Sequence, residues 1–69
     1  MPIYLAQPHE DLMIRQITGT DKVKNHLYNL GFVIGETIHL VSKVNDNVII
    51  KIKGVTMAIS KDLAKRVLV

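Results

Sequence analysis

The stretch Asp21–Glu36, DKVKNHLYNLGFVIGE, carries the signals that decide how this 69-residue chain folds. Its first half predicts an α-helix, because three apolar residues recur at a spacing that places them on one helix face: Val23, Leu27 and Leu30. Thr20 or Asp21 can cap the first turn, and the negative charge of Asp21 suits the positive end of the helix dipole. We therefore expect one helix here, and strands and connections in the rest of the chain.

Two glycines mark where this helix ends and where a strand follows. Gly31 comes directly after the last apolar position, where a residue in the left-handed conformation commonly ends a helix. Phe32 is placed to make the hydrophobic contact that often accompanies such an ending. Gly35 allows a tight turn, and the run Glu36–Val44 that follows is predicted as a β-strand.

The same residues carry a resemblance to a known family. Leu27–Glu36 resembles the Leu-x-x-Leu-Gly-hydrophobic-x-x-Gly signature of FeoA, the small cytosolic partner of the bacterial ferrous iron transporter FeoB. Ile52–Ile59 resembles the strand–glycine–strand segment of that family, and Lys61–Val69 resembles its closing Ala-x-x-Ile-x-Val segment. The resemblance extends from about Leu12 to the end of the chain. It departs at Pro8–Asp11, where FeoA-like chains often have a glycine-containing turn and this chain has no glycine.

Length and composition limit the classes of protein that the chain can be. With 69 residues it forms at most one domain, residues 1–69, with little room for a deep enzymatic cleft. It has no cysteine, which excludes disulfides, thiolate metal sites and a cysteine nucleophile. The start of the chain lacks the pattern of a secretory signal, and no apolar run approaches the ~20 residues that span a bilayer. We therefore expect a cytoplasmic protein without membrane insertion.

The first seventeen residues predict two short extended segments. Ile3–Leu5 is expected to form a short strand or an extended arm at the rim of the sheet. Leu12–Ile17 is predicted as a strand in which a bulge near Arg15–Gln16 returns Ile17 to the core, because bulges are common where small barrels bend.

After the helix, alternating apolar and polar residues predict three further strands and a closing one. Asn45–Asn47 is predicted as a hairpin loop, and Gly54 interrupts the next run. Ser60 is expected to cap a short helical turn through Ala64, and Arg66–Val69 to form the last strand. The residues expected to point inward are Ile38, Leu40, Val44, Val48, Ile50, Ile52, Val55, Met57 and Ile59.

These elements predict a mainly β fold with about five short strands, one α-helix and a short helical turn near the C-terminus. The connections are too short for repeated βαβ crossovers, so the sheet is expected to be mainly antiparallel. A sheet of this size buries its apolar face best by curling into a small barrel. This prediction agrees with the SH3-like barrel that the resemblance to FeoA implies.

His9, Glu10 and Asp11 are the only dense group of metal-ligating residue types. Adjacent residues on an extended chain point to opposite sides, so all three cannot easily reach one ion. We expect a solvated turn here and no metal site, with these residues as weak candidates for one. His26 and His39 are expected on the surface, where either could make binding sensitive to pH between about 5 and 8.

The charge pattern and the absence of motifs argue against an enzyme. The net charge is +3, and Lys43, Lys51 and Lys53 are expected to share an outward face of one hairpin. This basic stripe has no interleaved aromatic residue of the kind that single-strand binders use, so we expect no direct nucleic-acid binding. No phosphate-binding loop, nucleophile elbow or catalytic histidine pair is present, and no cofactor is expected.

The helix and its exit are the better candidates for a binding surface, because a small barrel cannot bury so many large apolar residues deeply. Leu27 and Leu30 are expected to close one end of the barrel. The residues predicted to contact a partner are Tyr28, Phe32 and Ile34 as apolar contacts, and Lys51 and Lys53 as steering charges.

The resemblance implies a non-enzymatic accessory protein of ferrous iron transport that binds the cytoplasmic part of FeoB. Two other functions stay open at this point. The same barrel resembles the C-terminal domain of metal-dependent transcriptional repressors, so the chain could be a regulatory module of such a system. A small-barrel nucleic-acid binder is the other alternative, and weak self-association is also left open.

Overall fold

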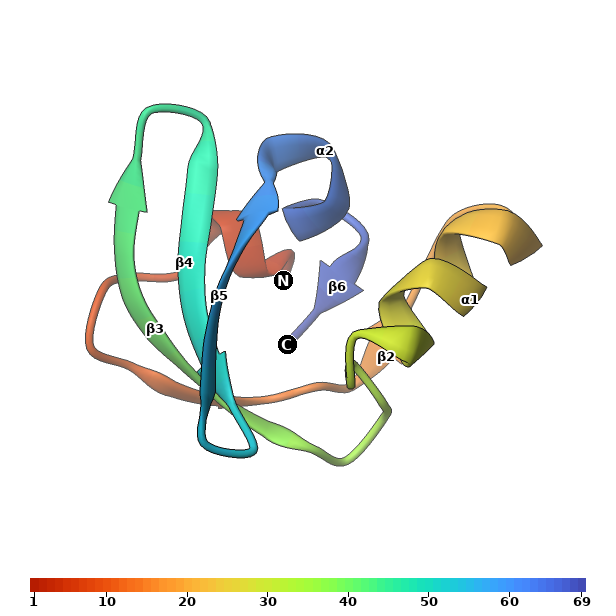
Figure 1. Cartoon of the computed structure of the whole chain (residues 1–69), viewed down its shortest axis with the longest axis horizontal. Helices are drawn as coiled ribbons and strands as arrows, with labels where there is room; N and C mark the ends of the chain where they lie inside the picture. Colours follow the sequence, from red (N-terminus) through yellow and green to blue (C-terminus); the bar gives the residue numbers. More distant parts are fainter.

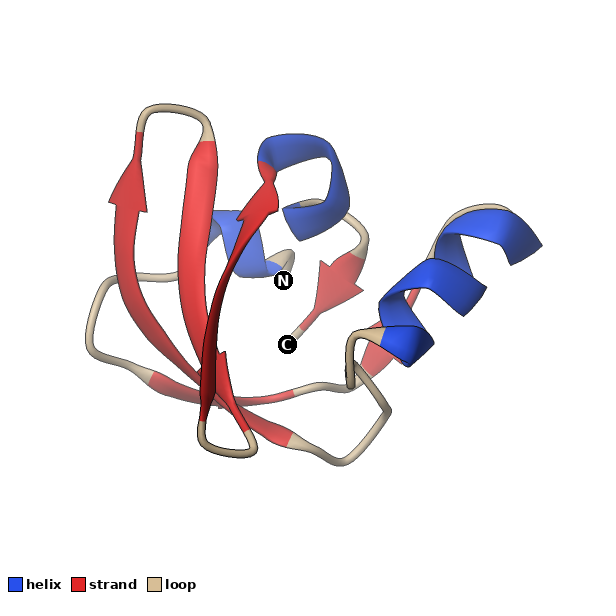
Figure 2. Cartoon of the chain, viewed as in Figure 1, coloured by secondary structure: helices blue, strands red, loops and turns tan.

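The larger of two β-sheets forms most of the barrel wall (Figures 1 and 2). The computed structural model describes all residues, Met1–Val69. In spatial order, the four antiparallel strands of this sheet are β1 (Asp11–Met13), β3 (Thr37–Val44), β4 (Asn47–Ile52) and β5 (Val55–Ser60). The smaller sheet pairs β2 (Gln16–Ile17) with β6 (Val67–Leu68), also antiparallel. The predicted mainly β, antiparallel fold is confirmed, with six strands in two sheets where about five strands were expected.

Three helical segments complete the chain: η1 (Ile3–Leu5), α1 (Asp21–Asn29) and α2 (Lys61–Ala64). Figure 1 shows η1 and α2 close to the concave side of the larger sheet, whereas α1 projects to one side of the barrel. Ser60 caps α2 as predicted, because its hydroxyl accepts the Leu63 amide at 3.4 Å. Of the two candidates for the cap of α1, the structure selects Thr20, whose hydroxyl accepts the Val23 amide at 3.3 Å.

The core is entirely apolar and draws on both sheets, on η1, on both α-helices and on the loop after α1. No polar or charged residue is buried, so folding leaves no interior charge to neutralise. The buried residues are Ile3, Ala6, Ile14, Ile17, Leu27, Phe32, Ile38, Leu40, Val48, Ile50, Ile52, Ile59, Ala64 and Val67.

The end of α1 has the hydrogen bonds of a Schellman motif, as its sequence predicts. Gly31 has φ +101°, and its amide donates to the Tyr28 carbonyl at 3.0 Å. The next amide, that of Phe32, donates to the Leu27 carbonyl at 3.0 Å. Leu27 and Phe32 are both fully buried, which matches the apolar contact that accompanies this motif. The helix therefore stops where Gly31 permits a left-handed residue, and Phe32 turns into the core.

The N-terminal prediction is wrong in one respect, because Ile3–Leu5 forms the 3-10 helix η1 and not a strand. Its amide bonds are local: Leu5 donates to Pro2 and Ala6 donates to Ile3, each at 3.0 Å. Proline fixes its own φ and lacks a donor, so Pro2 is well suited to start a turn. Ile3 is nevertheless fully buried, so the segment still contributes to the core.

Leu12–Ile17 was predicted as one bulged strand but is divided between the two sheets. The Ile14 amide donates to Glu36 at 2.9 Å, beside β3, and the next amide, that of Arg15, donates to Leu68 at 2.8 Å, in β6. The chain thus changes sheets where the bulge was expected, and Ile17 returns to the core as predicted.

Two residues that were expected to point into the core are exposed. Val44 is 52% exposed because the register of β3 against β4 shifts between Leu40 and Ser42, which reverses the sides of the residues that follow. Val55 is 55% exposed although it pairs with buried Ile52, because it is the first residue of the edge strand β5, directly after the β4–β5 turn. Alternation of apolar and polar residues therefore does not predict burial correctly at the bulge in β3 or at the start of the edge strand β5.

Candidate functional site

One end of the barrel collects exposed apolar side chains from three segments of the chain. Val33 and Ile34 lie in the loop after α1, Met13 ends β1, and Val55 follows the turn between β4 and β5; all four are exposed. The Gly35 amide donates to the Ile14 carbonyl at 2.8 Å, which holds the loop beside the end of β1. Met13 pairs with Thr37 and so points to the other face of the sheet from Val55, which pairs with Ile52. We therefore call Val33, Ile34 and Val55 the apolar end.

Lys53 lies in the β4–β5 turn, at the rim of the apolar end. Its ammonium group is 4.0 Å from a Glu36 carboxylate oxygen, which brings the β4–β5 turn next to the loop after α1. Lys53 and Gly54 have φ of +51° and +80°, the left-handed pair that a tight two-residue hairpin turn requires. The exposed ion pair contributes at most about 1 kcal/mol to stability, so Lys53 can exchange Glu36 for another acidic group at little cost.

The other residues predicted to contact a partner do not all join this surface. Ile34 is the most exposed of the large apolar residues, at 62%, and Tyr28 is exposed on α1. Phe32 is fully buried, so its predicted role as a partner contact is corrected to a role in the core. Lys51 is exposed but pairs with His39 across β3 and β4, away from the turn that holds Lys53.

The predicted basic stripe of three lysines does not form. Lys43 follows the register shift in β3, and its ammonium group lies 5.4 Å from the centre of the Tyr4 ring. Lys61 approaches the same ring at 5.2 Å. Lys43 thus lies against the Tyr4 ring near the start of α2. Lys51 and Lys53 remain as two separate exposed charges.

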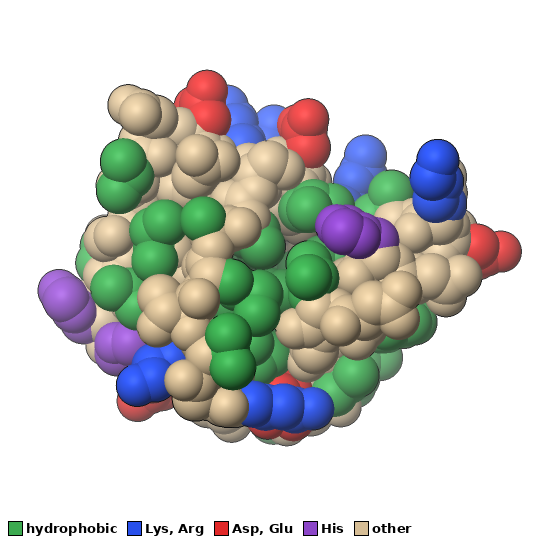
Figure 3. Space-filling model, in the orientation of Figure 1, with side chains coloured by type: hydrophobic (Ala, Val, Ile, Leu, Met, Phe, Trp, Pro, Cys, Tyr) green, Lys and Arg blue, Asp and Glu red, His purple; other side chains and the backbone are tan.

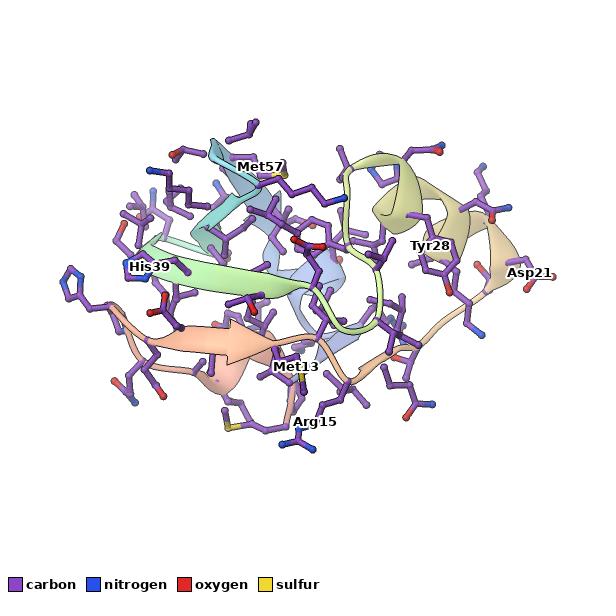
Figure 4. All side chains as sticks on the ribbon, turned by 90° about the horizontal axis from the view of Figure 1, so that it is seen from below. Met13, Arg15, Asp21, Tyr28, His39 and Met57 are labelled. Carbon is purple, nitrogen blue, oxygen red and sulfur yellow. The ribbon has the colours of Figure 1, made fainter.

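His9 and His39 lie close together, and Figure 4 shows His39 at the opposite end of the molecule from Tyr28 on α1. His39 Nδ1 lies 2.8 Å from an Asp11 carboxylate oxygen, and the ring centres of His9 and His39 are 6.4 Å apart. The Glu10 carboxylate accepts the Gln7 amide at 2.7 Å. No group of three or more His, Cys, Asp or Glu side chains has an arrangement that could hold a metal ion. His26 is exposed on α1, apart from this group.

The surface shows apolar side chains but no hollow. Figure 3 shows hydrophobic side chains in the middle of one face, between the larger sheet and α1, and no pocket opens on the surface. None of the helices has the length and apolar character needed to cross a membrane.

A family model for the FeoA domain matches residues 1–69, the whole chain. The chain belongs to the FeoA domain family. The resemblance in Leu27–Glu36 and in the C-terminal half is thereby confirmed, and with it a domain that serves as an accessory of ferrous iron transport. No curated protein sequence matches the chain.

Solved structures agree with this family and with its fold. The crystal structure of an iron uptake regulatory protein, FeoA, is 29% identical over 97% of this chain and 91% of its own, with a TM-score of 0.89. The zinc complex of FeoA from Stenotrophomonas maltophilia, a prokaryotic SH3 domain protein, is 23% identical over 99% of this chain and 87% of its own, with a TM-score of 0.85. The fold of this FeoA domain is therefore the predicted SH3-like barrel.

A manganese-dependent transcriptional repressor shares the fold alone. It is 7% identical over 97% of this chain but only 39% of its own, with a TM-score of 0.89. The remaining length of that repressor lies outside the part that resembles this chain.

Sequence reasoning missed two features of the surface. Val55 was not predicted as exposed, since it lies in an apolar strand run and only the order of the strands places it at an edge. The pairing of Asp11 with His39 was also missed, because it depends on the register of β1 against β3. The chain residues themselves carry no local signal for either feature.

Proposed function

We propose that residues 1–69 act as a single FeoA-like domain that binds the cytoplasmic part of a FeoB-type ferrous iron transporter and performs no chemistry of its own. The observation that carries this proposal is the apolar end, where Ile34 and Val55 are 62% and 55% exposed. Large apolar side chains exposed together on a small domain are typical of protein-binding surfaces. The Stenotrophomonas relative, described as a candidate activating factor of ferrous iron transport, supports the same role.

Docking through the apolar end gains its energy from burial and its orientation from charge. A fully buried isoleucine contributes about 1.5–3 kcal/mol relative to an exposed one, so Ile34 has the properties of an anchor. Lys53 at the rim and the net charge of +3 favour an acidic partner surface and would speed the encounter at low salt. Tyr28 and Lys51 lie farther along the surface and extend the contact only if the partner reaches α1 or the outer face of β4.

The proposal is tested by titration calorimetry of this protein against the cytoplasmic domain of FeoB from the same genome. Runs with and without guanine nucleotide, at two salt concentrations, cover the main binding conditions. We expect Ile34→Asp to weaken binding at least ~10-fold, since a charge would enter a buried contact. Lys53→Glu should weaken binding mainly at low salt.

Val44→Asp is the matched control. Val44 is an apolar residue of similar exposure, 52%, at the β3–β4 hairpin on the opposite end of the barrel (Figure 1). Val44→Asp should change the dissociation constant by no more than about two-fold, because a substitution at an exposed position outside the contact has little effect. Equal effects of Ile34→Asp and Val44→Asp, or no binding to the intact transporter, would overturn the proposal.

A further inference from the structure

The pair formed by His39 and Asp11 fixes which nitrogen of His39 is free. His39 Nδ1 lies 2.8 Å from Asp11 Oδ1, and an ionised carboxylate can only accept a hydrogen bond. Nδ1 must therefore carry the proton, which leaves the Nε2 lone pair of the neutral ring available. A carboxylate that holds a histidine in this way is the usual second partner of a metal-ligating imidazole, because it fixes the tautomer and raises the basicity of the ligand.

His9 is held near this ring by backbone hydrogen bonds to β3. Its amide donates to the Leu40 carbonyl at 2.6 Å, and the Leu40 amide donates to the Glu10 carbonyl at 3.0 Å. His9 has φ +72°, a conformation in which histidine is several-fold enriched among the few non-glycine residues that adopt it. The turn is thus held by hydrogen bonds on both sides of His9. The centre of the His9 ring lies 6.4 Å from that of the His39 ring, and the two ring planes are tilted by 47°.

We propose that His9 and His39 together bind one divalent transition-metal ion through their imidazoles, with Asp11 as the residue that positions His39. Two imidazoles bound to one tetrahedral ion at ~2.0–2.1 Å have ring centres about 5–6 Å apart. The ring centres of His9 and His39 are 6.4 Å apart, so they must move closer by about 1 Å to bind one ion. Rotation of the side chains allows this movement because both rings reach the surface. Water would complete the coordination.

The neighbouring residues define the class of ion and limit the ligand set. Two neutral imidazoles suit zinc, nickel, copper and iron(II), and do not suit magnesium or calcium, which prefer oxygen ligands. The Glu10 carboxylate is occupied by the Gln7 amide, so the adjacent trio His9, Glu10 and Asp11 is not the ligand set. Lys51 lies opposite His39 in the sheet, and its positive charge opposes a bound cation, so we expect a weak site.

The test is calorimetric titration of the whole chain with Zn²⁺ alone at about pH 7.5, since metal affinity falls when protons compete for the ligating nitrogens. One ion should bind each chain, and His9→Ala or His39→Ala should each weaken binding at least ~10-fold. Asp11→Asn should weaken it by about 10–100-fold, as is usual for a second partner of a ligating histidine. His39→Gln provides a second variant of similar size in case His39→Ala disturbs β3.

His26→Ala is the matched control, because His26 is an exposed histidine on α1, apart from the pair. It should bind Zn²⁺ as tightly as the unmodified chain. The proposal is overturned if His9→Ala binds as tightly as the unmodified chain, or if His26→Ala loses as much affinity as His9→Ala. One ion for every two chains, with a dimer in size-exclusion chromatography, would also overturn it. The outcome is independent of whether the apolar end binds a transporter.

Discussion

Phe32→Ala is predicted to bring the protein close to unfolding, although the residue lies only two positions from the exposed Ile34. Phe32 is the largest of the fully buried side chains, and its removal should cost about 3–5 kcal/mol of unfolding free energy. A domain of 69 residues has a total of roughly 3–10 kcal/mol at 0.05–0.15 kcal/mol per residue. The melting temperature should therefore fall by about 12–40 °C, since each kcal/mol shifts it by ~4–8 °C in a domain this small.

Far-UV circular dichroism during urea and thermal denaturation measures this change, because the chain has no tryptophan to report by fluorescence. Ile34→Ala is the control in the same loop and should cost less than ~0.5 kcal/mol, since Ile34 is 62% exposed. A loss below about 1 kcal/mol for Phe32→Ala, or equal losses for the two variants, would refute the assignment of Phe32 to the core. The same result would restore Phe32 as a candidate partner contact.

Two further substitutions test the backbone features that shape the fold. Gly31→Ala should cost about 1–2 kcal/mol, measured by urea denaturation, because Gly31 has φ +101° while the space around its Cβ position is open. Gly31→Asn should cost less, and equal stability of all three chains would show that the left-handed ending is dispensable. Val48→Thr should cost about 1–3 kcal/mol because Val48 is fully buried, whereas Val44→Thr should stay within ~0.5 kcal/mol. Similar losses at both valines would contradict the register shift in β3.

The sequence predicts local structure well wherever neighbouring residues determine it. The end of α1 is an example, because Gly31 and the spacing from Leu27 to Phe32 define a Schellman motif without any distant contact. The cap at Ser60 is another. Sequence reasoning could not separate Phe32 from Ile34 as core and surface, because that distinction depends on which side of the turn faces the barrel.

Features that depend on distant strands were the ones missed. The exposure of Val44 follows from one extra residue in β3 relative to β4, and that of Val55 from its position at the start of the edge strand β5. The approach of Asp11 and His39 depends on the register of β1 against β3, across 28 positions of sequence. Alternation of apolar and polar residues specifies the face of a regular strand but not its neighbours or its irregularities.

The two ends of the chain are hydrogen-bonded to each other. The Met1 amino group donates to the Val69 carbonyl at 3.0 Å, and the Val69 amide donates to the Met1 carbonyl at 2.7 Å. The backbone is thus almost a closed ring, so a short peptide could join the ends and new ends could be opened at Asn45–Asp46, in the exposed β3–β4 turn. For the same reason, the domain could be inserted into a surface loop of a host protein, entering and leaving it at nearly one point.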